Sequence, residues 1–206
     1  MNKINPELII GLGNPGKEYE NTRHNVGFLF IDQIKKSLDI KEFKFEKKLF
    51  AEIAETEFLI SNFQFSNKFQ IPNSKNKYKI LLAKPQTMMN NSGRSVKSII
   101  ENLKLKIENL IVVHDDIDIL WGNFKFSFGR SSAGHKGVAS IIKTLKTKNF
   151  WRLRIGIQPV RQAQGKPSIK KRVSADKIIL KKFTPAELKI LDQTIKEIIH
   201  TLSPDL

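Results

Sequence analysis

Short apolar runs alternate with helical patterns along most of this chain, and this alternation constrains its fold more than any other feature. Residues 7–12, 78–83 and 110–113 form apolar runs of the length expected for buried strands. Apolar residues at helical spacing follow the first run from Val26 and the second from Ser95. Strands that alternate with helices predict an α/β fold, with a twisted, mixed and mostly parallel sheet that carries helices on both faces. Sites in such folds gather at the carboxyl ends of the strands.

The rest of the pattern fits one domain. Residues 124–128 and 152–157 alternate apolar and polar side chains, which is typical of half-buried strands. Thr184 and Glu187 form a capping box that predicts a final helix. With 206 residues, of which 40% are hydrophobic, the chain can bury one substantial core but has little room for a second. We therefore predict a single domain over residues 1–206.

Charge and cysteine content restrict the classes of partner and chemistry. The 36 basic and 20 acidic residues give a formal net charge of +16, which attracts polyanions and nucleic acid above all. Coding bias can also enrich lysine, so the net charge alone does not establish nucleic-acid binding. The positions of the basic residues along the chain must distinguish the two explanations. The lack of cysteine excludes disulfides, thiolate nucleophiles and cysteine-bound zinc. Residues 1–6 do not resemble a signal peptide and no apolar run approaches a membrane span, so we expect a cytoplasmic protein.

A glycine-rich loop follows the first apolar run. Residues 11–16 match the G-x-G-x-x-G pattern of dinucleotide-binding proteins, in which backbone amides approach a pyrophosphate. Pro15 removes one of these amides, and no acidic residue ends a second strand at the required distance. A nucleotide-dependent oxidoreductase is therefore disfavoured. The loop is better interpreted as a tight turn that presents Asn14.

His24 lies in the polar stretch 21–25, just before a helical pattern begins. Histidine titrates near neutrality and can take a proton from water when a carboxylate fixes its tautomer. Asp115 closes a buried strand where active-site loops converge, which makes it the natural partner. A lone histidine in a loop is more often a surface residue, so the assignment of His24 depends on its neighbours.

Two further patterns near the strand ends allow more than one interpretation. Asp115, Asp116 and Asp118 place three carboxylates in four positions, as in a Mg²⁺- or Ca²⁺-dependent phosphoesterase. Strand alternation separates Asp115 from Asp116, and no second acidic cluster follows, so metal catalysis is the minor alternative. Asn90 offers an amide donor to a carbonyl or an oxyanion, although it can equally serve as a loop cap before the next helix.

Six motifs occur in order between about Leu8 and Ile157. They are Ile9-Ile-Gly-Leu-Gly-Asn-Pro-Gly16 with Tyr19, Thr22-Arg-His-Asn-Val-Gly27, Lys84-Pro-Gln-Thr-Met-Met-Asn90 with Ser92-Gly93, Val113-His-Asp-Asp116 with Asp118, Gly134-His135 with Gly137, and Phe150 with Arg152-Leu-Arg-Ile-Gly156. Together these motifs resemble the bacterial-type peptidyl-tRNA hydrolase family. A weaker similarity extends to Glu187.

The resemblance implies an enzyme that hydrolyses the ester between a peptide, or another N-blocked aminoacyl group, and the terminal ribose of tRNA, which recycles tRNA after aborted translation. It implies no cofactor and no metal, with peptidyl-tRNA as the partner of a monomer. Matched by motif, His24 is the general base for the attacking water and Asp115 is its carboxylate partner. Asn14 matches the asparagine that distinguishes blocked from free aminoacyl groups. Asn90 matches one that binds substrate and steadies the intermediate.

The resemblance also places further substrate or tRNA contacts, and some of them depart from the family pattern. The positions concerned are Tyr19, Met88, Lys136 and Arg154, and Lys125 is a candidate substitute within the tRNA contact. Lys136 stands where the family has asparagine, and Met88 replaces an aromatic residue.

A phosphate clamp is the most altered feature. Ser127 occupies the place of the basic residue that the family pairs with the arginine matched by Arg154, and Lys125 and Arg130 are the two candidates to compensate. The alternative function is an RNA-binding protein of this fold without hydrolysis. The presence of all four residues matched to catalysis disfavours it, while Lys136 favours it.

Overall fold

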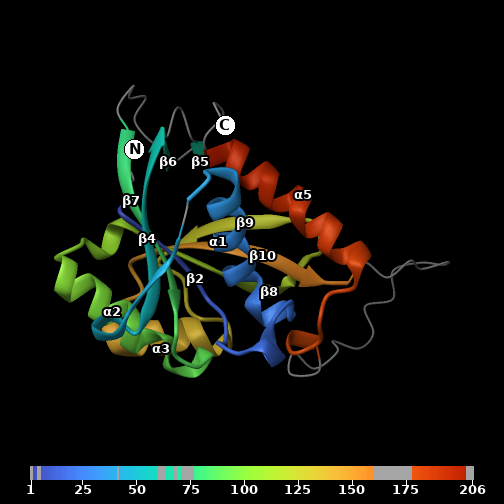
Figure 1. Ribbon diagram of the computed structural model, residues 1–206, viewed down its shortest axis with the longest axis horizontal. Helices are drawn as coiled ribbons and strands as arrows, with labels where there is room; N and C mark the ends of the chain where they lie inside the picture. The colour runs from blue at the N-terminus through green and yellow to red at the C-terminus, as the bar shows by residue number, and fades with distance from the viewer. Residues whose placement is uncertain are drawn as a thin grey trace.

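The protein is described here by a computed structural model that covers residues 2–3, 6–40, 42–59, 64–66, 69–70, 77–159 and 178–202. One seven-stranded sheet, of order β3-β4-β7-β2-β8-β10-β9, forms its centre (Figure 1). A separate small sheet pairs β1 (Asn2–Lys3), β6 (Phe69–Gln70) and β5 (Gln64–Ser66). The expected α/β class with a mixed sheet is confirmed.

The four middle strands of the large sheet run parallel to one another. They are β7 (Lys77–Pro85), β2 (Leu8–Gly11), β8 (Leu110–Leu120) and β10 (Trp151–Gln158). Antiparallel strands complete both edges, namely β3 (Lys44–Glu46), β4 (Ala51–Leu59) and β9 (Phe124–Phe128). The carboxyl ends of the parallel strands therefore meet at one edge of the sheet, where the polar motifs lie.

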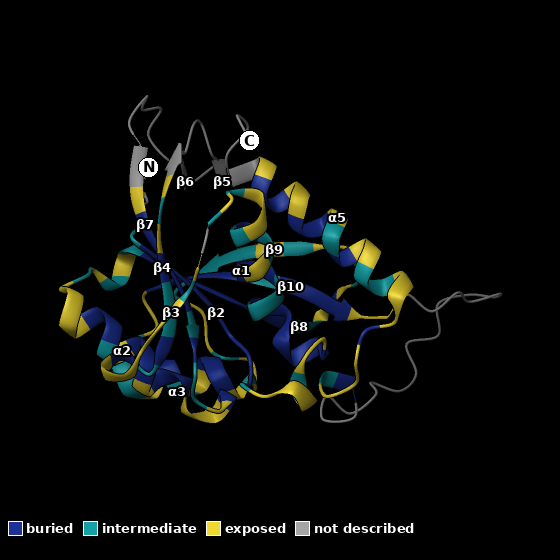
Figure 2. Cartoon of the chain, in the orientation of Figure 1, coloured by how far each residue is buried: buried dark blue, intermediate teal, exposed yellow. Residues whose placement is uncertain are grey.

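Helices cover both faces of the sheet, and each face has its own hydrophobic core (Figure 2). Helices α1 (Val26–Ser37) and α5 (Pro185–Leu202) contribute to one core, and α2 (Ser92–Leu103) and α3 (Lys136–Leu145) to the other. Five short 3-10 turns are described as well: η1 (Lys17–Tyr19), η2 (Arg23–Asn25), η3 (Lys47–Leu49), η4 (Met89–Asn91) and η5 (Ile107–Asn109). None of the described helices has the length and apolarity of a membrane span.

Two glycines let helix α1 begin directly against the sheet. A Cβ atom on Gly11 would lie 2.1 Å from the carbonyl oxygen of Gly27, and one on Gly27 would lie 2.5 Å from the carbonyl oxygen of Val113. No side chain fits in either place, because real Cβ contacts are longer than 3 Å. The first glycine of the loop therefore serves the packing of α1, and this packing holds η2, with His24, over the ends of β2 and β8.

Candidate active site

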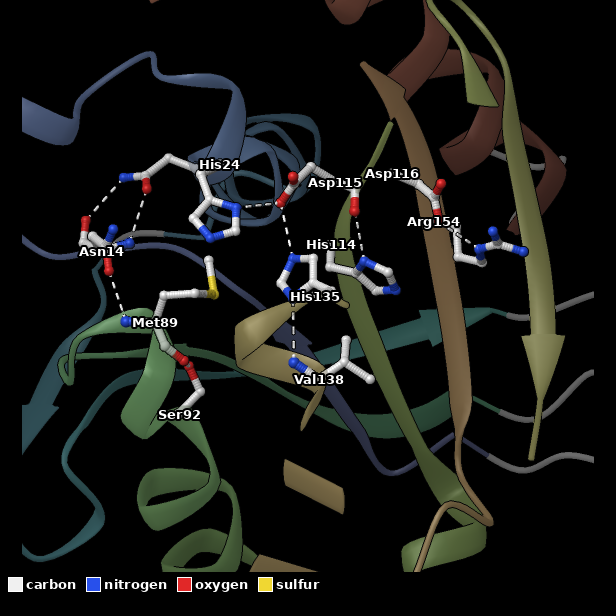
Figure 3. A network of polar contacts seen from close by, with 11 residues as sticks. Asn14, His24, Met89, Ser92, His114, Asp115, Asp116, His135, Val138 and Arg154 are labelled. Atoms are coloured by element: carbon white, nitrogen blue, oxygen red, sulfur yellow. Dashed lines mark hydrogen bonds and ion pairs between the residues drawn. The ribbon is translucent and has the colours of Figure 1, made fainter. Parts of the chain in front are cut away.

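His24 and Asp115 meet at the carboxyl edge of the sheet. The Nδ1 atom of His24, in η2, lies 2.7 Å from Oδ1 of Asp115, in β8, and both side chains are buried (Figure 3). Burial alone would raise the pKa of the Asp115 carboxyl, but electrostatic attraction to His135 and His24 and the hydrogen bonds from their ring N–H groups hold this pKa well below its ordinary value. The ionised carboxylate accepts the Nδ1 proton of His24. The Nε2 atom of His24 therefore keeps a lone pair that can take a proton from water.

Two more histidines surround Asp115. Nε2 of His135 lies 3.0 Å from the same oxygen, Oδ1, of Asp115. His114 donates its Nδ1 proton to the backbone carbonyl of Asp115 at 2.7 Å, and the His114 and His135 rings are 4.6 Å apart. Burial, followed by the neighbouring His135, lowers the pKa of His114 well below its ordinary value. His114 is therefore an uncharged support for this end of β8.

The spacing of His24, Asp115 and His135 would also suit a metal ion, because one ligand atom of each lies within 4.8 Å of the others. The backbone N–H of Val138 donates to Nδ1 of His135 at 3.2 Å, so the ring proton must be on Nε2. To bind a metal ion here, Nε2 of His135 would need a lone pair, but this nitrogen carries the proton. The arrangement is that of two donors on one carboxylate rather than that of a metal centre. The carboxylates of Asp115 and Asp116, as the strand alternation predicted, engage different partners.

Asn14 is fixed on the opposite side of His24 from Asp115 (Figure 3). Its side-chain oxygen accepts the backbone N–H of Met89 at 2.7 Å, and its own backbone is held by the side chain of Asn25 through bonds of 2.8 and 2.9 Å. Because the oxygen is occupied, the Nδ2 group is the end of the amide that remains to donate to another molecule. Asn25 was not singled out from the sequence, although it directly follows His24 in the same motif.

The other residues expected around the site lie on its rim. Asn90 and Tyr19 belong to the turns η4 and η1, where Asn90 is exposed and Tyr19 is half-buried. Met88 is 45% exposed at the start of η4, whereas Met89 is buried and bonds to Asn14. Lys136 is the exposed first residue of α3, directly after His135. The structure thus ties Met89 into the site more firmly than Met88.

Basic side chains lie on β10, which is next to β8, and on the edge strand β9 beyond it. Arg154 and Lys125 are directly opposite each other in the antiparallel pair β10 and β9, so their side chains share one face of the sheet. Nε of Arg154 donates to Asp116 at 2.7 Å, and the terminal nitrogens of the guanidinium point away from that carboxylate (Figure 3). Ser127 is instead opposite Arg152, which is buried. Register therefore makes Lys125 the neighbour of Arg154.

A contact that sequence reasoning missed joins the turn of His24 to the last helix. Arg23 donates to the backbone carbonyls of Lys181 and Lys182 at 3.1 and 3.0 Å and to Glu187 at 2.6 Å. Glu187 also accepts the backbone N–H of Thr184, which confirms the predicted capping box. Arg23 and its partners are more than 150 residues apart in the chain, so no local sequence pattern predicts this contact. The only signal in the sequence was the position of Arg23 beside His24.

An oriented histidine and a fixed amide at the strand ends of an α/β sheet, with cations on the adjoining strands, define a hydrolase of the general-base type that suits a polyanionic substrate. The peptidyl-tRNA hydrolase family model matches residues 8–204. The chain belongs to the peptidyl-tRNA hydrolase family.

Individual relatives agree with this assignment. The chain is 42% identical to a peptidyl-tRNA hydrolase of Aquifex aeolicus over 95% of this chain and 88% of that protein. It is 39% identical to one of Mycoplasma mycoides over 96% and 91% of the two chains. A crystal structure of peptidyl-tRNA hydrolase from Acinetobacter baumannii superposes with a TM-score of 0.73 at 25% identity, covering 98% of this chain and 95% of that one.

Proposed function

We propose that this chain hydrolyses the ester bond of peptidyl-tRNA with His24 as the general base. The observation that carries the proposal is the 2.7 Å contact between Nδ1 of His24 and Asp115, which leaves Nε2 as the basic atom. Nε2 takes a proton from a water molecule while the water oxygen attacks the ester carbonyl. The tetrahedral intermediate then releases the ribose oxygen, which takes the proton from His24. The products are the peptide carboxylic acid and tRNA with a free terminal hydroxyl.

Asp115 and two asparagines assist this reaction in the proposal. The Asp115 carboxylate stabilises the imidazolium that forms when His24 takes the proton. Asn14 presents its Nδ2 donor to the amide carbonyl that an N-blocked aminoacyl group has and a free one lacks. A free aminoacyl group brings an ammonium instead, which offers no acceptor to this donor. Asn90, exposed in η4, donates to the substrate carbonyl as it becomes an oxyanion.

The basic and rim residues hold the tRNA. Arg154 and Lys125 share a face and bind backbone phosphate together, in place of the clamp that Ser127 cannot form. Lys136 adds a cation at the start of α3, and Tyr19 and Met88 line the approach to the ester. Because phosphate contacts release counterions, tRNA affinity falls steeply with salt, and a flat response would contradict this part of the proposal.

The compartment and the oligomeric state belong to the proposal as well. We place the protein in the cytoplasm, where its substrate is produced and where a chain without cysteine needs no oxidising surroundings. The expected state is a monomer. Light scattering of the purified protein at several concentrations tests this, and a mass of two chains that persists on dilution would contradict it.

The decisive experiment compares N-blocked and free aminoacyl-tRNA side by side in the presence of a chelator. The wild-type protein should release the blocked group only. His24→Ala should abolish release while the far-UV circular dichroism stays unchanged. His200→Ala, which alters an exposed histidine of α5, is the matched control and should remain fully active. Wild-type protein that binds tRNA without releasing the blocked group would favour the RNA-binding alternative, and full activity of His24→Ala would remove His24 as the base.

A further inference from the structure

A single oxygen of Asp115 accepts from two histidines. Oδ1 lies 2.7 Å from Nδ1 of His24 and 3.0 Å from Nε2 of His135, and Asp115 is almost completely buried. A carboxylate oxygen that shares its charge between two donors attracts each of them less than it would attract one alone. Only the donor of His24 takes part in the proposed reaction, so the donor of His135 has no role in it so far.

The start of helix α3 determines which proton His135 carries. His135 is the N-cap of α3, and its Nδ1 accepts the backbone N–H of Val138, one of the amides that a helix start otherwise leaves unpaired. An accepting Nδ1 has no proton, so the proton must be on Nε2, which faces Asp115. The cap of α3 thereby makes His135 a fixed donor to the carboxylate.

We propose that His135 is a positioning residue for the hydrolysis, which donates from Nε2 to Asp115 and so limits how strongly this carboxylate retains a proton on His24. The inference rests on the proposed role of His24 as the base. A base must release to the leaving ribose oxygen the proton that it took from water. A carboxylate bonded to His24 alone would favour the protonated ring more strongly, and less of the enzyme would then be ready to accept a proton at a given pH.

The other ionisable groups around the three side chains do not supply this effect. His114, from β8, is bonded to the backbone of Asp115 rather than to its carboxylate. Arg152 and Arg154, from β10, have Asp116 as the neighbouring carboxylate, and Arg154 bonds to it directly. Arg23, from η2, pairs with Glu187.

Lys136, from α3, completes the set of charged neighbours. It follows His135 in the chain, and its side chain is exposed to solvent, where screening weakens its effect on the buried carboxylate. His135 is therefore the group, among the described residues, that moderates the carboxylate directly.

Two substitutions separate the two bonds of His135. His135→Asn keeps an acceptor close to the position of Nδ1, and asparagine is a good N-cap, but its side chain is too short to reach Asp115. His135→Gln places an amide donor close to the position of Nε2 but is a poor cap. Asn therefore retains the helix cap and loses the donor, while Gln does the reverse. The pH dependence of kcat/KM for an N-blocked aminoacyl-tRNA and the hydrogen exchange of the Val138 amide are measured for both variants.

His135→Asn should move the acidic limb of the kcat/KM profile to higher pH, by on the order of half a unit to one unit, with Val138 still protected from exchange. His135→Gln should leave the limb in place and expose Val138. An unmoved limb in the Asn variant, or equal shifts in both variants, would overturn the inference. These failures differ from a failure of the proposed function, in which the wild-type protein shows no acidic limb or His24→Ala keeps one.

Discussion

Replacing Asp115 by asparagine removes one charge and almost nothing else from the site. In the wild-type protein, Nδ1 of His24 and Nε2 of His135 bond to Oδ1 of Asp115 at 2.7 and 3.0 Å. The amide oxygen of asparagine can accept both of these hydrogen bonds. The side chain is nearly the same size, so the buried surroundings need not rearrange. Any loss of rate therefore reports the electrostatic support that the carboxylate gives to the imidazolium of His24.

The size of this loss follows from the geometry. Given the 2.7 Å contact between the nearest atoms, the centres of the two charges are about 4 Å apart, and at an effective dielectric constant of about 20 they attract each other by about 4 kcal/mol. Because about 1.4 kcal/mol corresponds to a factor of ten in rate, Asp115→Asn should lower kcat/KM by roughly 1000-fold. The acidic limb should also move to lower pH, opposite to the shift expected for His135→Asn.

The assay measures kcat/KM on an N-blocked aminoacyl-tRNA from acidic to alkaline pH, with Asp192→Asn as control. Asp192 is a half-buried residue of α5 that pairs with the exposed Lys196, so its neutralisation should leave the profile unchanged. A loss below about tenfold in Asp115→Asn, or an acidic limb that moves upward, would refute the electrostatic role of the carboxylate.

Three further predictions concern residues around the site. Glu187→Ala removes the bond that the Glu187 carboxylate accepts from the Thr184 N–H and the bond to Arg23, while Thr184 still caps α5. It should lower the free energy of unfolding by about 2 kcal/mol in urea denaturation, and a change below about 0.5 kcal/mol would show that these two bonds contribute little. The pKa of His114 is lowered in the folded protein, so below its ordinary value of 6.5 the unfolded chain binds a proton that the folded chain does not. The free energy of unfolding therefore decreases as the pH is lowered below 6.5, by at most about 1.4 kcal/mol per pH unit. Urea denaturation between pH 5 and 7 should show that the free energy of unfolding changes less with pH in His114→Asn than in the wild-type protein. An equal change in both proteins would assign the pH dependence to another group. Lys136→Asn removes one cation from the proposed tRNA contact but restores the asparagine that the family has at this position, so activity in the tRNA assay should not fall, and a large loss would show that this chain depends on the lysine.

The parts of the fold that follow from local pattern were predictable. Alternating strands and helices gave the sheet class, and the rule that sites lie at strand ends brought Asp115 to His24. The strand alternation at residues 115 and 116 also anticipated that the two carboxylates would have different partners. Each of these inferences needs only the direction of a side chain within its own element.

Contacts that depend on packing between distant elements were not predictable. The bond between His135 and Asp115 requires the docking of α3, and the bond between Arg23 and Glu187 requires the docking of α5. Which of the two adjacent methionines, Met88 or Met89, is buried against Asn14 depends on where a short 3-10 turn begins. Sequence periodicity does not fix that start to within one residue. Lys125 was one of two candidates to accompany Arg154 until the register of β9 and β10 distinguished them.

The contact between Arg23 and the start of α5 has a consequence for the order of events during synthesis. A protein that acts on peptidyl-tRNA is itself a peptidyl-tRNA while it is being translated. The turn that contains His24 emerges early, but the carbonyls and the carboxylate that Arg23 binds are made more than 150 residues later. The turn therefore lacks this one anchor until α5 has been synthesised, and before then it is held by the earlier contacts of Asn25 with Asn14 and of His24 with Asp115.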